Sequence, residues 1–182
     1  MNEKYKINEL PLDALVPFKN HPFKVIENEE LTALAQSIKE SGVLVPALAR
    51  PAGDRYELIS GHRRLAACKL LGLPTIPVIV RDLTDAEAII TMVDANLQRE
   101  HILPSEKAFA YKMKMEAMKH QGKTSRQVGT MSRTDEEIAK ESKDSARQIQ
   151  RYIRLTNLIP EILDMVDNKE IALTPAVELS YL

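Results

Sequence analysis

The residues best suited to chemistry begin at Gly61, which is followed by His62, Arg63 and Arg64. The apolar run ending at Ser60 predicts a strand, and the residues after the glycine predict a helix. The first N–H groups of a helix have no partner within the helix, and the dipole is positive at that end. Together with two guanidinium groups, this end predicts a seat for a phosphate or sulfonate. An equally good alternative on spacing alone is that both arginines pair with nearby carboxylates.

A second polar pair is Asn96 and Arg99, which lie one helical turn apart. At this spacing an amide and a guanidinium can face one site. Taken alone the pair carries little weight, because the solvated ends of helices are often rich in such residues.

Two short helices are predicted at about 135–155, joined by a polar turn of three or four residues, as in a helix-turn-helix. The polar side of the second helix carries side chains that read guanine and adenine edges in the major groove, and residues near its start could hold DNA phosphates. The candidate base readers are Arg147, Gln148, Gln150 and Arg151, and the candidate phosphate contacts are Lys143 and Ser145. The alternative is a helical bundle with a solvated basic face; the short capped turn favours DNA.

The net charge of −1 hides an uneven distribution of charge along the chain. Residues 1–110 have a net charge of −2, residues 119–154 of +4, and residues 155–182 of −4. A basic segment between acidic ones favours contact with DNA at that segment alone. The single cysteine, Cys68, excludes a disulfide framework. No apolar run reaches the length of a spanning helix, so we expect a cytoplasmic protein without a membrane partner.

Hydrophobic periodicity and cap residues predict the elements that must position these side chains. The first part alternates helices with strands, and everything after a polar connection at 121–133 is predicted to be helical. The predicted helices lie at about 31–41, 62–71, 84–99, 104–120, 134–142, 145–154, 160–166 and from Thr174 onward, and the strands at 47–50, 56–60 and 76–80. We therefore expect an α+β N-terminal domain with a small mixed sheet, residues 1–104, and an all-α DNA-binding domain, residues 105–182.

Three ordered motifs and the helix pair after them resemble the ParB family of chromosome and plasmid partitioning proteins over most of the chain. The segment Gly42-Val43-Leu44-Val45-Pro46 resembles the family's Gly-(Ile/Val)-x-x-Pro segment, and Gly61-His62-Arg63-Arg64 resembles its Gly-Glu-Arg-Arg box. Asn96-Leu97-Gln98-Arg99 and the residues to Ala108 resemble its third motif. The resemblance implies the N-terminal fold that ParB proteins share with sulfiredoxins.

The family resemblance also implies ligands and partners. It implies that the N-terminal domain binds CTP with Mg²⁺, and that double-stranded DNA promotes closure of a homodimer into a clamp that CTP hydrolysis helps to reopen. It implies a ParA-type ATPase as a partner and a place on the nucleoid or on a plasmid. By position, the nucleotide site would contain Gly42, Val43, Gly61, His62, Arg63, Arg64, Asn96 and Arg99, with Asn96 at the metal.

The chain departs from the family pattern at several positions. His21-Pro22-Phe23 stands where the family has Gln-Pro-Arg, and His62 replaces the glutamate of the arginine box. Ala95 stands where the family has its acidic metal ligand, and Asp94 is one position away. A magnesium site short of a carboxylate is weak or differently built, so CTP hydrolysis is left open. Segments resembling the family's basic N-terminal tail and C-terminal dimerisation domain are not found, and we expect a truncated form.

Other function classes fit less well. The departures at Phe23 and Ala95 favour, as the alternative, a ParB-like transcriptional or mobile-element regulator that has lost the nucleotide switch. Sulfiredoxins carry a cysteine where Gly61 stands, whereas Cys68 lies two turns into the helix, so we expect no sulfiredoxin activity. Nuclease activity is not expected either, because no carboxylate cluster suits a catalytic metal pair.

Overall fold

The computed structural model describes residues 6–122 and 134–182. The chain divides into two compact units, the first ending at Thr84 and the second beginning at Asp85. The helix that begins at Asp85 therefore belongs to the second compact unit, while the functional domain boundary at 104/105 stays a prediction.

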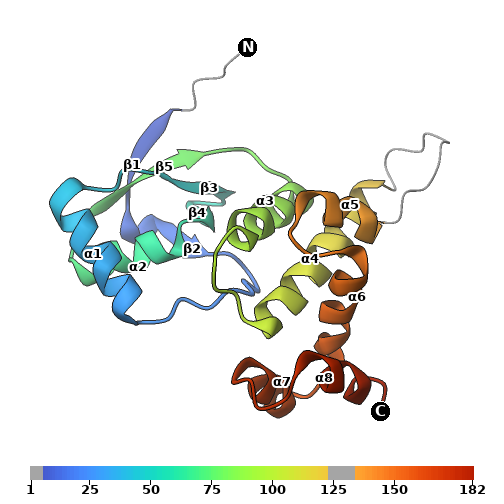
Figure 1. The fold of residues 1–182 in the computed structure, drawn as a ribbon. Coiled ribbons are helices and arrows are strands. Elements are labelled where there is room, and N and C mark those ends of the chain that lie inside the picture. Colours follow the sequence, from blue (N-terminus) through green and yellow to red (C-terminus); the bar gives the residue numbers. More distant parts are fainter. Residues whose placement is uncertain (1–5, 123–133) are drawn as a thin grey trace. The chain divides into compact units, whose positions relative to one another are not determined.

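A five-stranded mixed sheet forms the centre of the first unit (Figure 1). The strands follow the order β1-β5-β3-β4-β2, with antiparallel β1–β5 and β3–β4 pairs and parallel β5–β3 and β4–β2 pairs. Their bounds are β1 Ile7–Pro11, β2 Leu15–Pro17, β3 Ala47–Ala52, β4 Arg55–Ser60 and β5 Thr75–Val80. The predicted small mixed sheet and the β3–β4 hairpin are confirmed.

The strands β1 and β2 were not predicted from the sequence. β2 is three residues long, and β1 contains no buried side chain, so neither produces a clear hydrophobic alternation. Pro77 lies inside β5, a strand with neighbours on both sides, but its pairing with β3 begins only at Val78. At Pro77 the strand pairs with β1 alone, which is why the ladder accepts a residue without an N–H group.

Two helices, α1 (Glu29–Ser41) and α2 (His62–Leu70), pack on each other and against the sheet. Leu31, Ala35 and Ile38 form the buried side of α1, as their spacing predicts. They join Leu65 of α2 and Val78 of β5 in one hydrophobic cluster. Each fully buried leucine, isoleucine or valine contributes about 1.5–3 kcal/mol relative to an exposed one, so this cluster fixes where α2 begins relative to β3 and β4.

The second unit is helical throughout the residues that the structure describes, so the predicted fold class is confirmed. Its helices are α3 Asp85–Leu97, α4 Pro104–Gly122, α5 Thr134–Glu141, α6 Ala146–Arg154, α7 Pro160–Asp167 and α8 Leu173–Leu179. The long helix α4 contacts α3, α5, α6 and α7 (Figure 1). No helix of residues 6–122 and 134–182 combines the length and the apolar character needed to cross a membrane.

Helix bounds in the second unit differ from the prediction at two places. α4 continues to Gly122, so the first two residues of the predicted polar connection are helical, and the rest of that connection lies outside the described residues. α8 begins at Leu173 after the N-cap residue Ala172, so Thr174 is not its cap. The Thr174 hydroxyl instead accepts a hydrogen bond from Arg151 of α6.

Candidate functional site

The amino-terminal end of α2 is built around Gly61. Gly61 has φ +106°, and a Cβ added there would lie 2.9 Å from the Cβ of Ala47 on β3. A larger residue would therefore be strained by its backbone and would clash with the neighbouring strand. The chain turns directly from β4 into α2, whose first residue is His62. The helix start directly after the glycine that the sequence predicts is present.

The two arginines of the first turn have different partners. Arg63 pairs with Glu30 of α1, with 3.1 Å between the nitrogen and the oxygen, and these side chains are 33% and 59% exposed. An ion pair this exposed contributes about 0–1 kcal/mol, so an anionic ligand can replace Glu30. Arg64 instead donates to the carbonyl oxygens of Val45 and Pro46. Burial is the main cause that lowers the pKa of Arg64.

The loop that Arg64 holds follows α1. Gly42 has φ +71° and its N–H donates to Ile38 at 2.8 Å, which ends the helix. Val43 is half-buried against the hydrophobic cluster, whereas Leu44 and Val45 are exposed. Within the first unit, the structure therefore brings Gly42 and Val43 to the same side of the fold as α2 through Arg64.

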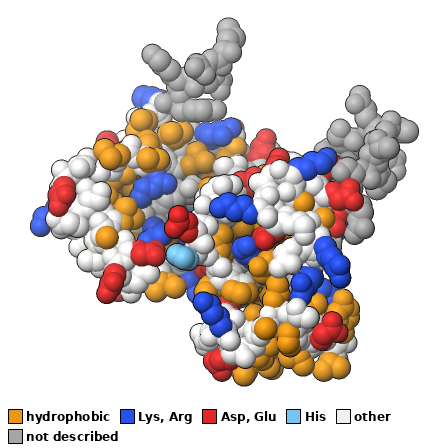
Figure 2. All heavy atoms as spheres, viewed as in Figure 1, with side chains coloured by type: hydrophobic (Ala, Val, Ile, Leu, Met, Phe, Trp, Pro, Cys, Tyr) orange, Lys and Arg blue, Asp and Glu red, His pale blue; other side chains and the backbone are white. Residues whose placement is uncertain are grey.

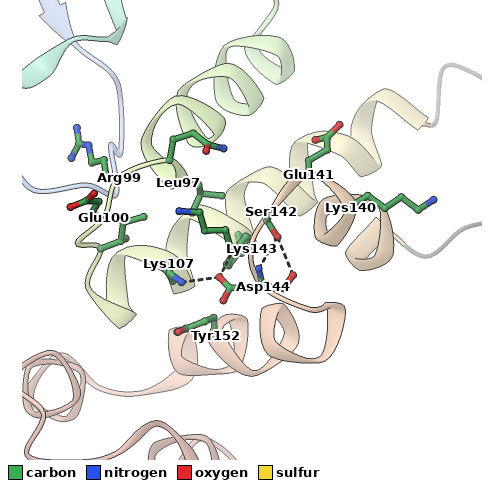
Figure 3. A pocket seen from close by; sticks show the side chains of 13 residues that line it. Leu97, Arg99, Glu100, Lys107, Lys140, Glu141, Ser142, Lys143, Asp144 and Tyr152 are labelled. Atoms are coloured by element: carbon green, nitrogen blue, oxygen red, sulfur yellow. Dashed lines mark hydrogen bonds and ion pairs between the residues drawn. The ribbon is translucent and has the colours of Figure 1, made fainter.

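Asn96 and Arg99 lie at the end of α3, in the second unit. Asn96 is 3% exposed, and its Nδ2 donates to the Met92 carbonyl at 2.8 Å. Arg99 lines a cavity of about 360 Å³ together with residues of α4, α5 and the turn before α6 (Figure 3). The two predicted residues therefore have different surroundings: the Asn96 amide is buried, whereas Arg99 lines a cavity.

A buried lysine connects α3, α4 and α5. Lys114 of α4 is 1% exposed, and its Nζ lies 2.6 Å from Oδ1 of Asp94 and 2.9 Å from Oε2 of Glu141. Burial alone would lower the pKa of Lys114, but the hydrogen bonds and charges of the two carboxylates outweigh it, so the pKa is raised. Asp94 therefore stabilises the packing of α3 on α4 through its ion pair with Lys114.

The turn between α5 and α6 is held against α4. Asp144 accepts hydrogen bonds from Lys107 Nζ at 2.8 Å and from the Tyr111 hydroxyl at 2.6 Å (Figure 3). Burial, and then the bond to Asp144, raises the pKa of Tyr111. Ser145 caps α6, because its hydroxyl accepts a hydrogen bond from the Gln148 N–H. Ile138 and Ile149 are fully buried between the helices.

The polar side chains of α6 fall into two groups. Lys143 and Arg147 are exposed, and neither makes a hydrogen bond or ion pair with the residues that the structure describes. Gln150 donates to Asp135 of α5 at 3.0 Å, and Arg151 donates to Thr174 of α8. On the face drawn in Figure 2, Lys and Arg side chains are interspersed with acidic ones and form no single large basic patch.

Comparison with known proteins identifies the family. The family model for the ParB N-terminal domain matches residues 1–97. The chain belongs to the ParB family. The chromosome-partitioning protein Spo0J of Thermus thermophilus is 38% identical over 162 residues, which are 89% of this chain and 55% of that protein. This chain spans about half the length of the curated relatives it matches, 43–55% for the first three.

A solved ParB structure resembles the fold of this chain over most of its length. The C-terminally truncated ParB of Caulobacter crescentus, complexed to the centromeric parS site, is 27% identical and has a TM-score of 0.63, with 95% of this chain and 84% of that chain covered. The same truncated protein complexed with CTP-γ-S is 28% identical, with a TM-score of 0.48 and coverage of 97% and 93%. The expected ParB resemblance is confirmed.

Three departures from the ParB motifs lie together in the first unit. The His21 ring stacks on the His62 ring with 3.8 Å between centroids, and it meets the Phe23 ring edge-on at 5.7 Å. Phe23 is 3% exposed, and His62 Nε2 accepts from the Phe18 N–H at 3.5 Å. Three polar positions of the ParB motifs, two of them charged, are therefore occupied by one aromatic cluster in this chain.

The residues near Asn96 do not fit the Mg²⁺ site that the ParB resemblance implies. Mg²⁺ in nucleotide sites is bound through one or two carboxylates together with phosphates. Ala95 has no ligand atom, and the Asp94 carboxylate is held by Lys114. Within residues 6–122 and 134–182, no three His, Cys, Asp or Glu side chains gather into a possible metal site.

Sequence reasoning missed several residues of these sites. Lys107, Tyr111, Lys114 and Asp144 connect helices far apart in the chain, and Arg154 binds Ser180 and stacks 3.8 Å from the Tyr181 ring. A charged residue inside the apolar stripe of α4 was the available signal for Lys114. The other contacts depend on which helices meet, which spacing alone does not determine.

Proposed function

We propose that this chain is a sequence-specific DNA-binding protein of the partition type, whose N-terminal domain binds CTP and controls a DNA clamp in chromosome or plasmid segregation. The observation that carries the proposal is the α5–α6 pair, in which a capped helix presents Arg147 at its exposed start while its other face is buried on α4 and α5. The family and the ParB relative solved with parS support it.

The α5–α6 pair acts as a helix-turn-helix in this proposal. A reading helix contacts base edges through its first residues, and Arg147 and Gln148 occupy the first turn of α6. Lys143 and Ser145, in the turn before it, contact DNA phosphates. Gln150 and Arg151 also face the DNA side, but their bonds to Asp135 and Thr174 make them the residues that orient the reading helix.

The DNA part of the proposal is tested with Arg147→Ala on a double-stranded oligonucleotide carrying a parS-type site and on a scrambled duplex. Loss of a bidentate base contact should weaken binding to the site by about 1–3 kcal/mol and leave binding to the scrambled duplex unchanged. Lys119→Ala, an exposed lysine of α4, is the matched control. Equal loss on both duplexes would mean that Arg147 contacts phosphate only, and an unchanged affinity would remove it from the interface.

The nucleotide part of the proposal rests on the first turn of α2. Gly61, the first-turn N–H groups of α2 and the Arg63 guanidinium form the anion seat, while Arg64 holds the Gly42–Val43 loop in place. His62, Asn96 and Arg99 complete the residues that the family resemblance assigns to the nucleotide. We propose CTP as the ligand, with hydrolysis and Mg²⁺ left to experiment.

Titration calorimetry with CTP, ATP, GTP and UTP tests this part. CTP should bind most tightly, and Arg63→Ala should abolish binding without changing the circular dichroism spectrum. Arg55→Ala, an exposed arginine at the start of β4, serves as the control. CTP affinity that survives in the Arg63 variant would exclude the seat at α2.

The second candidate is a ParB-like regulator that has kept the fold and lost the nucleotide switch. The observation that favours it is the buried Phe23 at a phosphate-contacting arginine of the family, together with Ala95 at the acidic ligand. Absence of any preference for CTP in the calorimetric series would select the regulator.

Under the partition proposal, the chain acts on the nucleoid or a plasmid as a homodimer with a ParA-type ATPase as its partner. Cross-linking on parS DNA with and without CTP tests the dimer.

A further inference from the structure

One side-chain hydrogen bond joins the middle of α6 to the start of α5. Nε2 of Gln150 on α6 donates to Oδ2 of Asp135 at 3.0 Å. Asp135 is 4% exposed and lies in the first turn of α5, where the positive end of the helix dipole favours a carboxylate. Both helices belong to the second unit (Figure 1). A buried carboxylate is therefore in direct contact with an amide of the proposed reading helix.

This carboxylate determines which way the Gln150 amide faces. An ionised carboxylate only accepts hydrogen bonds, whereas a primary amide has two N–H donors on its nitrogen and an acceptor oxygen opposite. If the amide were turned over, Oε1 would face Oδ2 of Asp135, and two acceptors would meet with no proton between them. Oε1 is therefore held away from Asp135, and the bond uses one of the two N–H groups.

Gln150 lies at the edge of the surface that the proposed function assigns to DNA. Residues three apart on a helix are neighbours, so Gln150 is beside the exposed Arg147. The buried side of α6 carries Ile149, which is fully buried, and Ile153, which packs against the same cluster. Gln150 is half-buried between these two sides. An amide of fixed orientation at this place is suited to one kind of base edge.

We propose that Gln150 reads an adenine of the target in the major groove, and that Asp135 is the positioning residue that fixes its amide. Oε1 accepts from the N6 amino group of adenine while the second N–H donates to N7, which is the bidentate contact that glutamine makes with this base. Guanine has acceptors at both O6 and N7, so its O6 would face Oε1. The inference rests on the proposed function, and it names the base and the residue that selects it.

Replacement of single atoms in the DNA tests the Gln150 contact on the unsubstituted chain. Each adenine of a parS-type duplex is replaced in turn by purine, which lacks the N6 amino group, and by 7-deazaadenine, which lacks N7. Fluorescence anisotropy should find at least one adenine at which these replacements weaken binding, by roughly 5- to 100-fold when both contacts are lost.

Gln150→Ala should weaken binding to the unmodified duplex by a similar factor, and replacements at that adenine should then have no further effect. Comparing both proteins on the same duplexes cancels any effect of the modified bases on the DNA itself. If no adenine depends on Gln150, or if the dependence is on a cytosine, the inference is overturned.

Asp135→Asn tests the positioning role. Asparagine can accept or donate, so the Gln150 amide can turn over and meet guanine with its N–H groups. The ratio of affinities for adenine and guanine at the identified base pair should fall several-fold. Glu136→Gln, which removes the same charge from an exposed position of the same turn, is the matched control and should keep the ratio. Asp135→Ser, whose hydroxyl also accepts and donates, gives the same prediction if the asparagine variant does not fold. A ratio equal to that of the control contradicts the positioning role.

The outcomes distinguish this inference from the proposed function. Preference for the parS-type duplex over a scrambled one, without an adenine that depends on Gln150, supports the partition proposal and overturns the inference. An adenine that depends on Gln150, in a chain whose affinity does not change in Arg147→Ala, supports the inference and refutes the base-reading role of Arg147. Equal affinity for the parS-type and scrambled duplexes overturns the DNA part of the proposed function and the inference with it.

Discussion

Replacing Gly61 by alanine should destabilise the first unit and remove the anion seat together. Gly61 has φ +106°, outside the region that L side chains adopt, and such backbone strain costs about 1–2 kcal/mol. The new Cβ would also lie 2.9 Å from the Ala47 Cβ and 3.2 Å from the Ala47 Cα. Because Ala47 lies on a central strand and its Cβ is fixed to the backbone, the contact cannot be relieved by rotating a side chain.

Overpacking of this kind costs about 1–3 kcal/mol, so the free energy of unfolding should fall by about 2–5 kcal/mol in total. Gly53→Ala is the matched control, since Gly53 has φ +65° in the β3–β4 turn and its Cβ would meet nothing within 4 Å. The control should lose only the conformational part, about 1 kcal/mol. The difference between the two variants isolates the clash with Ala47.

Urea unfolding followed by circular dichroism measures both variants against the unsubstituted chain. Gly61→Ala should unfold at a clearly lower urea concentration than Gly53→Ala, and CTP binding should be lost only in Gly61→Ala. Equal midpoints for the two variants would refute the packing of β3 against Gly61. An unchanged midpoint for both would refute the backbone argument as well.

Three further predictions concern the second unit. Lys114→Met should lower the free energy of unfolding by about 1–3 kcal/mol. The loss should be smaller than for a fully buried ion pair, because the Asp94 and Glu141 side chains are 43% and 66% exposed. A double-mutant cycle with Asp94→Asn measures the coupling between the two residues, and strict additivity of the two changes would contradict the contact. Because the pKa of Tyr111 is raised in the folded protein, its neutral phenol stabilises the fold below about pH 10, and this stability is lost as the pH rises further. The melting temperature of Tyr111→Phe should therefore fall less steeply above about pH 10 than that of the unsubstituted chain or of the control Tyr181→Phe. Ala95→Glu should make CTP affinity increase on addition of Mg²⁺, and calorimetry that finds no such increase would contradict the assignment of position 95 to the metal.

Much of this protein follows from the sequence by itself. The helices α1, α2, α4 and α7 follow from apolar spacing, and Gly42 ends α1 as expected, because these signals act within a few residues of one another. The glycine-arginine segment after β4 and the motifs around it were sufficient to predict the ParB family and the fold class. Local charge counting also separated the basic segment from its acidic neighbours.

The tertiary structure decided the strands β1 and β2, which exist only through pairing with β5 and β4. It also decided which polar side chains remain available to a ligand. Arg64 binds carbonyl groups of the loop after α1, and Asp94 binds Lys114 twenty residues further along. Spacing places such residues on a helix face, but their partners come from distant segments, and only the packing of those segments brings the charges together.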